Sequence, residues 1–149
     1  MTFTRAFLEQ CADNKMILLV IIGVIIDTIF GVMRAIKWKK FNSSVGIDGA
    51  IRKAGMLVSL IFFQAIDILV HINLIGFIPE EVRSYIGGQI GLTEFFAILY
   101  IAYEVTSILK NMALCGLPVK HVWEAVSKFL SKYTDELPDA DELDEKTHT

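Results

Sequence analysis

The sequence has few of the residues on which catalytic and disulfide-bonded proteins depend. Its 149 residues include 2 cysteines, 3 histidines and 3 prolines. Cys11 and Cys115 stand far apart without a metal-ligand spacing, so we expect two free thiols rather than a disulfide framework. The histidines are scattered, and no Ser/His/Asp group, glycine-rich phosphate loop or pair of catalytic carboxylates on a soluble domain can be assembled. We therefore expect no enzyme, no cofactor and no metal site.

Charged residues are also scarce. They make up 21% of the chain, whereas apolar residues make up 54%, more than a soluble domain of this length carries. All of the acidic excess behind the net charge of -3 lies in the last residues, 134–149, and the remainder of the chain is net basic. The composition predicts an all-α integral membrane protein, because the excess apolar surface needs lipid.

Three apolar stretches are long enough to cross a hydrocarbon core about 30 Å thick, which takes about 20 helical residues. They are residues 16–36, 54–78 and 90–109. Buried helices of a soluble protein are the alternative, but too little polar chain remains to cover three of them. The charged residues before the first stretch differ from a cleavable signal peptide, so we expect that stretch to remain as a span.

The chain after the third span has two parts. Residues 118–133 place apolar side chains three and four apart, with lysines on the other side, which predicts a basic amphipathic helix. Such a helix could lie on the inner leaflet with Trp123 at the interface, or it could pack against a neighbouring subunit. Residues 134–149 are acidic and are predicted to be disordered. Residues 1–133 are therefore expected to form a single membrane domain.

The distribution of Lys and Arg predicts the orientation. The segment between the first two spans holds the basic residues Arg34, Lys37, Lys39, Lys40, Arg52 and Lys53. Within it, FNSSVGIDG at 41–49 reads as a turn-rich loop in which Asp48 could cap the second helix. The second loop has one basic residue, Arg83, beside two acids. We expect the first loop and the C-terminus in the cytoplasm and the N-terminus outside.

Polar side chains inside the spans are the candidates for function, because an ionised group at mid-bilayer costs roughly 2.5–3.5 kcal/mol on insertion scales. They are Asp27, Asp67, His71 and Glu104. Gly23 and Gly31 share a helical stripe with Asp27, where another helix can approach closely. The polar stripes could hold one subunit together, in which case Asp67 and His71 could form a hydrogen-bonded pair, or they could face other subunits.

The order of these features resembles bacteriophage holins of the toxin-secretion and phage-lysis type. The similarity runs from DTIFGVMRA in the first span, through SSVGIDGAIRK, to EVTSILKNMALCGLPV at the end of the third. The matching positions are Ser44, Gly46, Gly49, Arg52, Lys53, Glu104, Ser107, Asn111, Gly116 and Pro118. Lys110 departs from the pattern, since members of the family often have an acid before this asparagine.

The resemblance implies a small protein that forms homo-oligomeric lesions in the bacterial cytoplasmic membrane and so releases an endolysin or a toxin, without binding the endolysin directly. Two other classes fit the residues. A small ion channel or transporter subunit would use Asp27, Asp67, His71 and Glu104 as an ion or proton path. A membrane anchor would recruit a partner through residues 118–149. The basic loop is explained by topology, so we expect no nucleic-acid binding.

Overall fold

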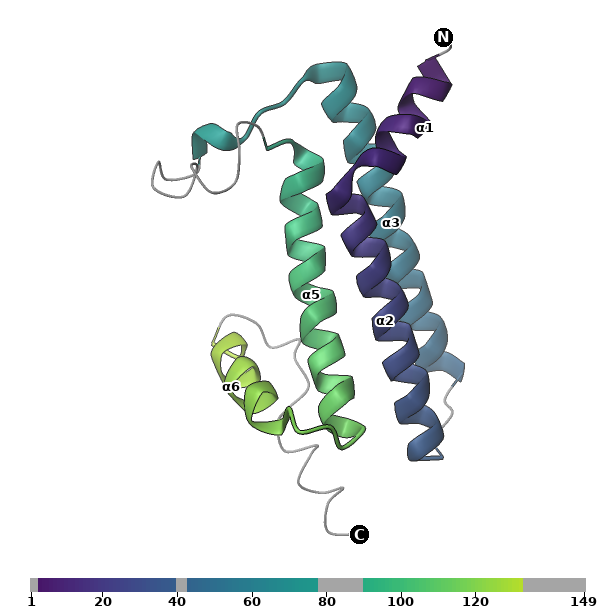
Figure 1. Ribbon diagram of the computed structural model, residues 1–149, viewed down its shortest axis with the longest axis vertical. Coiled ribbons are helices and arrows are strands. Elements are labelled where there is room, and N and C mark those ends of the chain that lie inside the picture. The colour runs from purple at the N-terminus through teal and green to yellow at the C-terminus, as the bar shows by residue number, and fades with distance from the viewer. Residues whose placement is uncertain (1–2, 40–42, 78–89, 133–149) are drawn as a thin grey trace. The chain divides into compact units, whose positions relative to one another are not determined.

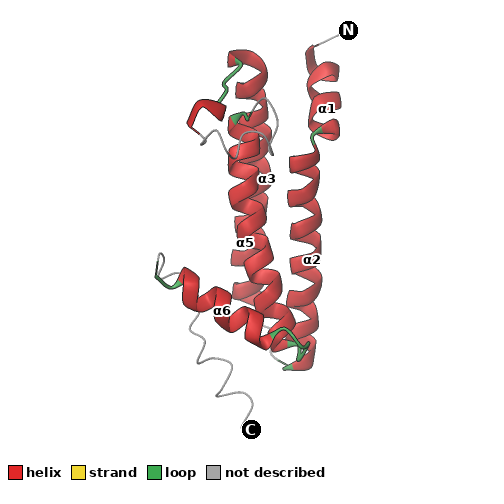
Figure 2. Cartoon of the chain, turned by 60° about the vertical axis from the view of Figure 1, so that its left-hand side comes forward, coloured by secondary structure: helices red, strands yellow, loops and turns green. Residues whose placement is uncertain are grey.

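A computed structural model of the chain describes residues 3–39, 43–77 and 90–132 (Figure 1). Within these ranges the regular elements are all helices and none is a strand (Figure 2). They are α1 (Phe3–Asp13), α2 (Lys15–Lys37), α3 (Ser43–Val70), the short 3₁₀ helix η1 (Ile75–Phe77), α5 (Leu92–Leu114) and α6 (Lys120–Leu130). The predicted all-helical class is confirmed.

Three helices are long and apolar enough to cross a membrane: Lys15–Lys37, Gly46–Val70 within α3, and Leu92–Leu114. A helix of 23 residues, such as α2 or α5, is about 35 Å long at 1.5 Å per residue. The chain buries only 17%, 11% and 17% of the residues in the most apolar parts of these helices. Most of their apolar surface is thus left for lipid or for another subunit.

The second helix differs most from its prediction. It was expected at 54–78, but α3 runs from Ser43 to Val70. It begins earlier because the charged residues that were assigned to a loop are also compatible with a helix. Asp48 is an exposed residue inside α3 and is not its cap. It ends earlier because His71 adopts a left-handed conformation, with φ of 56°, which the apolar residues after it do not reveal.

The other helices lie close to their predicted positions. The spans predicted at 16–36 and 90–109 correspond to α2 (Lys15–Lys37) and α5 (Leu92–Leu114). The amphipathic helix predicted at 118–133 corresponds to α6 (Lys120–Leu130), whose first residues lie two positions later than expected. Residue 133 and the acidic tail at 134–149 lie outside the described residues, so the tail and the single domain at 1–133 stay predictions.

The chain divides into two compact units, and the first comprises Met1–Ile25 and Asn42–Tyr103. Here the first part of α2, helix α3 and the first part of α5 lie side by side (Figure 1). Val20, Leu60 and Ala97, one from each helix, are fully buried at the centre of this unit. Phe63 and Phe96 stack with ring centroids 4.2 Å apart, which adds a specific contact between α3 and α5.

The second unit comprises Ile26–Phe41 and Glu104–Thr149. Its described helices are the C-terminal part of α2, the C-terminal part of α5, and α6. Trp123 of α6 is only 1% exposed and packs with Leu114, Leu109 and Ala113 of α5. Burial of an indole of this size fixes α6 beside the end of α5.

Candidate functional site

The first polar cluster lies in the first unit, where α3 meets the start of α5. The Asp67 carboxylate accepts hydrogen bonds from the backbone N–H groups of Leu92 and Thr93, at 2.9 and 2.8 Å, and from the Thr93 hydroxyl at 2.7 Å. The first N–H groups of a helix lack partners within the helix and attract negative charge. Asp67 therefore caps α5 from a different helix.

Asn14 extends this cluster to α2. Its side-chain oxygen accepts hydrogen bonds from the backbone N–H groups of Met16 and Ile17, at 3.0 and 3.3 Å, so it is the N-cap of α2. Its amide nitrogen donates to Gln64 Oε1 at 2.8 Å and to Glu94 Oε1 at 3.0 Å. One asparagine thus starts α2 and binds α3 and α5.

Gly91, directly before α5, lies close to the Asp67 side chain of α3. Its backbone N–H donates to Glu94 Oε2 at 2.9 Å, the reciprocal bond of a capping box. A Cβ atom at Gly91 would lie 2.5 Å from Asp67 Oδ2. The residue must therefore lack a side chain for the Asp67 carboxylate to reach the helix end.

Asp67 and His71 were both expected inside the second span, and the end of α3 at Val70 corrects this expectation. Asp67 lies in the last turn, and His71 lies beyond Val70 with its side chain exposed. The two side chains do not hydrogen-bond to each other. Instead the His71 backbone N–H donates to the Asp67 carbonyl at 2.9 Å, while the Asp67 carboxylate caps α5.

The second polar cluster lies in the second unit. Asn111 Nδ2 donates to Asp27 Oδ1 at 2.8 Å, and both side chains are buried. Gly31 lies one turn after Asp27, and a Cβ there would be in ordinary van der Waals contact with Asn111 Nδ2, at 3.9 Å. Glu104 is 1% exposed on the same helix as Asn111. Asp27 is thus paired with a polar side chain of α5, while the role predicted for the glycine stripe stays a prediction.

The end of α5 is closed by a Schellman motif. Gly116 has φ of +85°, its N–H donates to Ala113 O at 2.9 Å, and the Leu117 N–H donates to Met112 O at 3.1 Å. Pro118 follows directly and cannot continue the helix. These bonds set the direction in which the chain leaves α5.

Two residues at the end of α2 bind the last carbonyl groups of α5. Lys37 Nζ donates to Cys115 O at 2.7 Å, and Trp38 Nε1 donates to Leu114 O at 3.2 Å. A cation is favourable at the carbonyl end of a helix. The end of α5 is therefore fixed both by its own turn and by α2.

Comparisons with known proteins identify the family of the chain. A family model described as the bacteriophage holin family matches residues 7–134. The chain belongs to the bacteriophage holin family. The holin-like protein TcdE of Clostridioides difficile is 43% identical to it over 144 residues, which cover 95% of this chain and 85% of that protein. No solved structure matches.

The predicted family and the predicted role as a holin are confirmed. Membership implies a pore-forming rather than an enzymatic role, association with membranes, and oligomerisation. Together with the three long apolar helices, it makes the chain a multi-pass membrane protein.

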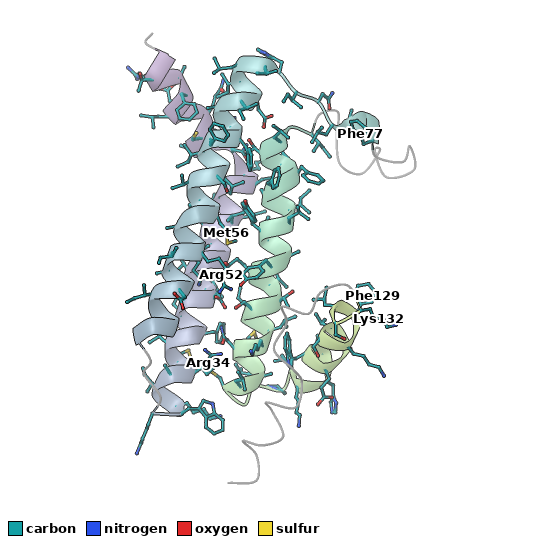
Figure 3. The ribbon with its side chains drawn as sticks, turned by 180° about the vertical axis from the view of Figure 1, so that it is seen from behind. Arg34, Arg52, Met56, Phe77, Phe129 and Lys132 are labelled. Carbon is teal, nitrogen blue, oxygen red and sulfur yellow. The ribbon has the colours of Figure 1, made fainter. Side chains whose placement is uncertain are left out.

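Several motif positions of this holin are explained by structure. Gly116 and Pro118 close α5, and Asn111 binds Asp27. Arg52 of α3, which is labelled in Figure 3, donates to the Tyr103 hydroxyl of α5. Lys53 donates to the Val24 carbonyl of α2 at 3.3 Å.

The remaining predicted positions of the holin are not brought together. Gly46 and Gly49 lie on α3, where a Cβ would meet no atom within 4 Å. Ser107 and Gly23 are half-buried on α5 and α2, and Ser44 lies in the first turn of α3. Their functional role stays a prediction.

Sequence reasoning missed the residues that connect the helices of the first unit. Asn14 precedes an apolar helix, which is a recognised N-cap signal, and Gly91 precedes Glu94 by three residues, which suits a capping box. Both signals lie within a few residues of the helix that they start. The capping of α5 by Asp67 has no such local signal, because Asp67 and the start of α5 are far apart in sequence.

Proposed function

We propose that this holin assembles in the bacterial cytoplasmic membrane into oligomeric lesions large enough to release an endolysin or a toxin. The observation that carries the proposal is the partition of side chains in the spans. Asp27, Gln64, Glu104 and Asn111 are buried, whereas large apolar residues on all three helices are exposed. Three helices enclose no wide aqueous pore, so passage of a folded protein requires several copies.

The proposed orientation places the N-terminus outside and the C-terminus in the cytoplasm. The support is the excess of Lys and Arg between α2 and α3 and after α5. In this orientation the chain enters α5 from the outer side and leaves it on the cytoplasmic side. α6 is then the basic amphipathic helix of the membrane domain, followed by the acidic tail.

The acids are proposed to have different roles. Asp27 and Glu104 remain buried among helices before triggering and line a wetter interface between copies afterwards. Asp67 acts by holding the start of α5, and His71 lies beside it at the outer end of α3. The energetic reason is that a carboxylate that leaves a buried polar contact is far less costly at a hydrated interface than in hydrocarbon.

Inducible expression in a bacterium tests the proposal. Growth and membrane potential are followed with and without a co-expressed cytoplasmic peptidoglycan hydrolase that has no signal sequence. Abrupt, delayed lysis only in the presence of the hydrolase is the expected result, and it requires no direct binding between the two proteins. Depolarisation without hydrolase release would instead identify a small channel, and no change in permeability would identify an anchor.

The variant Asp27→Asn provides a matched comparison, because it keeps the size of the side chain and removes its charge. We expect the time of lysis to change while the amount of protein in the membrane stays the same, measured by immunoblot of the membrane fraction. Asp48→Asn, an exposed acid on α3, serves as the control. Equal lysis times for all three proteins would contradict a role for the Asp27 charge.

A further inference from the structure

Helix α6 has two apolar faces with different surroundings. Trp123 is buried on α5, whereas Val122 and Phe129 are 52% and 59% exposed. At about 100° per residue, Val122 and Phe129 share one side of the helix, and this side is distinct from that of Trp123. We call these two side chains the α6 strip.

The charges next to the α6 strip are unequally compensated. Glu124 lies 3.8 Å from Lys120 Nζ and 3.4 Å from His121 Nδ1, so the one acid on α6 is shared between these two side chains. No acid among residues 3–39, 43–77 and 90–132 pairs with Lys128 or Lys132. Phe129 and Lys132 both lie at the end of α6 that is distant from α5 (Figure 3).

The orientation of α6 is fixed from within the second unit. The Schellman turn at Gly116 sets the exit from α5, and Trp123 holds α6 against Leu114. Only residues 115–119 separate the two helices. α6 therefore stays close to the end of α5, with the α6 strip turned away from the Trp123 contact.

We propose that the α6 strip docks on the anionic inner leaflet of the membrane, with Val122 and Phe129 among the upper acyl chains and Lys128 and Lys132 on lipid phosphate groups. This inference rests on the proposed function, which places the end of α5 at the cytoplasmic face. An apolar strip bordered by lysines is the pattern by which amphipathic helices bind such surfaces. Each lysine near an anionic leaflet contributes about 1 kcal/mol.

A second copy of the chain is a weaker occupant for this surface. A stable protein interface buries about 800 Å² on each partner. Two side chains supply less than roughly 500 Å², since even an aromatic one buries about 150–250 Å². Binding to lipid requires no minimum buried area, because each inserted side chain contributes separately to the binding free energy.

The test uses the full chain, with Cys11→Ser and Cys115→Ser, in vesicles of phosphatidylcholine with or without phosphatidylglycerol. A polarity-sensitive fluorophore is attached at Val122→Cys on the strip or at Lys120→Cys, about 160° away around the helix. We expect lipid-borne nitroxides to quench the label at 122 and aqueous iodide to quench the label at 120. Replacing Lys128 or Lys132 by Gln should lower the docked-to-undocked ratio about fivefold each in anionic vesicles, and leave it unchanged in phosphatidylcholine.

Equal quenching of both labels by iodide in anionic vesicles would overturn the inference. Shielding of position 122 from both quenchers would also overturn it, because protein rather than lipid would then cover the strip. A variant ending at residue 133 would show whether the acidic tail is that cover.

Resistance to alkaline extraction is measured in the same samples. If the chain resists extraction and iodide quenches the label on the strip, only the α6 inference is contradicted. If alkali extracts the chain, the proposed function is contradicted as well.

Discussion

Single residues at the ends of α5 have requirements that follow from geometry. Gly116 adopts φ of +85°, and a Cβ there would lie 2.9 Å from Lys37 Nζ. The left-handed conformation alone costs a residue with a side chain about 1–2 kcal/mol. We expect Gly116→Ala to lower the free energy of unfolding in detergent by about this amount, measured by titration with SDS and circular dichroism. Gly76→Ala is the control, because a Cβ at Gly76 meets no atom within 4 Å; equal losses would contradict the explanation.

Gly91 and Asp67 form a coupled pair at the other end of α5. A Cβ at Gly91 would collide with the Asp67 carboxylate, 2.5 Å away, and would displace it from the N–H groups of Leu92 and Thr93. Loss of a cap costs about 1 kcal/mol. Gly91→Ala should therefore destabilise the protein strongly, and the shorter side chain of Asp67→Ser should relieve part of the added cost. A double-mutant cycle with no coupling energy would show that the two residues act independently.

At the scale of elements, the start of α2 depends on Asn14. Asn14→Ala removes the cap of α2 and the donor to Gln64 and Glu94, and we expect a loss of about 2 kcal/mol in unfolding free energy. Asn14→Ser keeps an oxygen that can cap the helix but cannot reach both partners, so it should recover about half of the loss. The same SDS titration measures both variants. If the serine variant were no better than alanine, capping would contribute little.

The existence of the helices could be predicted, but the ends of α3 could not. Uncharged apolar runs identify α2 and α5 because a helix exposed to lipid needs apolar residues on most of its surface. Around α3 the same rule failed at both ends. Arg52 and Lys53 lie within the helix, since their long side chains reach Tyr103 and Val24, and His71 ends it with a backbone conformation that hydropathy does not encode.

The polar clusters could be predicted only in part. The spacing of Asp27 and Gly31 indicated a face for close helix packing, and Asn111 does approach Asp27 across that face. The role of Asp67 could not be predicted, because two of its three partners are backbone N–H groups, and every residue except proline presents the same backbone donor. Side-chain patterns along one helix indicate which face is polar, whereas the partner depends on how the helices are packed.

At the scale of the whole molecule, the two cysteines report the proposed topology. Cys11 lies in α1 before the first span, and Cys115 lies directly after α5. In spheroplasts a membrane-impermeant maleimide should label Cys11 and leave Cys115 unlabelled, so the Cys11→Ser variant should be labelled only after permeabilisation. Mass spectrometry of the labelled peptides measures this. Labelling of Cys115 in sealed spheroplasts would reverse the orientation.

The pH dependence of that labelling follows from the surroundings of Cys11. Burial raises the pKa of the Cys11 thiol, so less of it is thiolate at neutral pH, and thiolate is the form that reacts with maleimide. Below the pKa the thiolate fraction rises about tenfold per pH unit, so the labelling rate should still be rising between pH 7 and pH 8.5. An unfolded sample, in which Cys11 is fully solvated, should react faster at each pH. Equal rates for folded and unfolded protein would mean that the thiol is not shielded in the membrane, and the contact of α1 with α3 would then have to be revised.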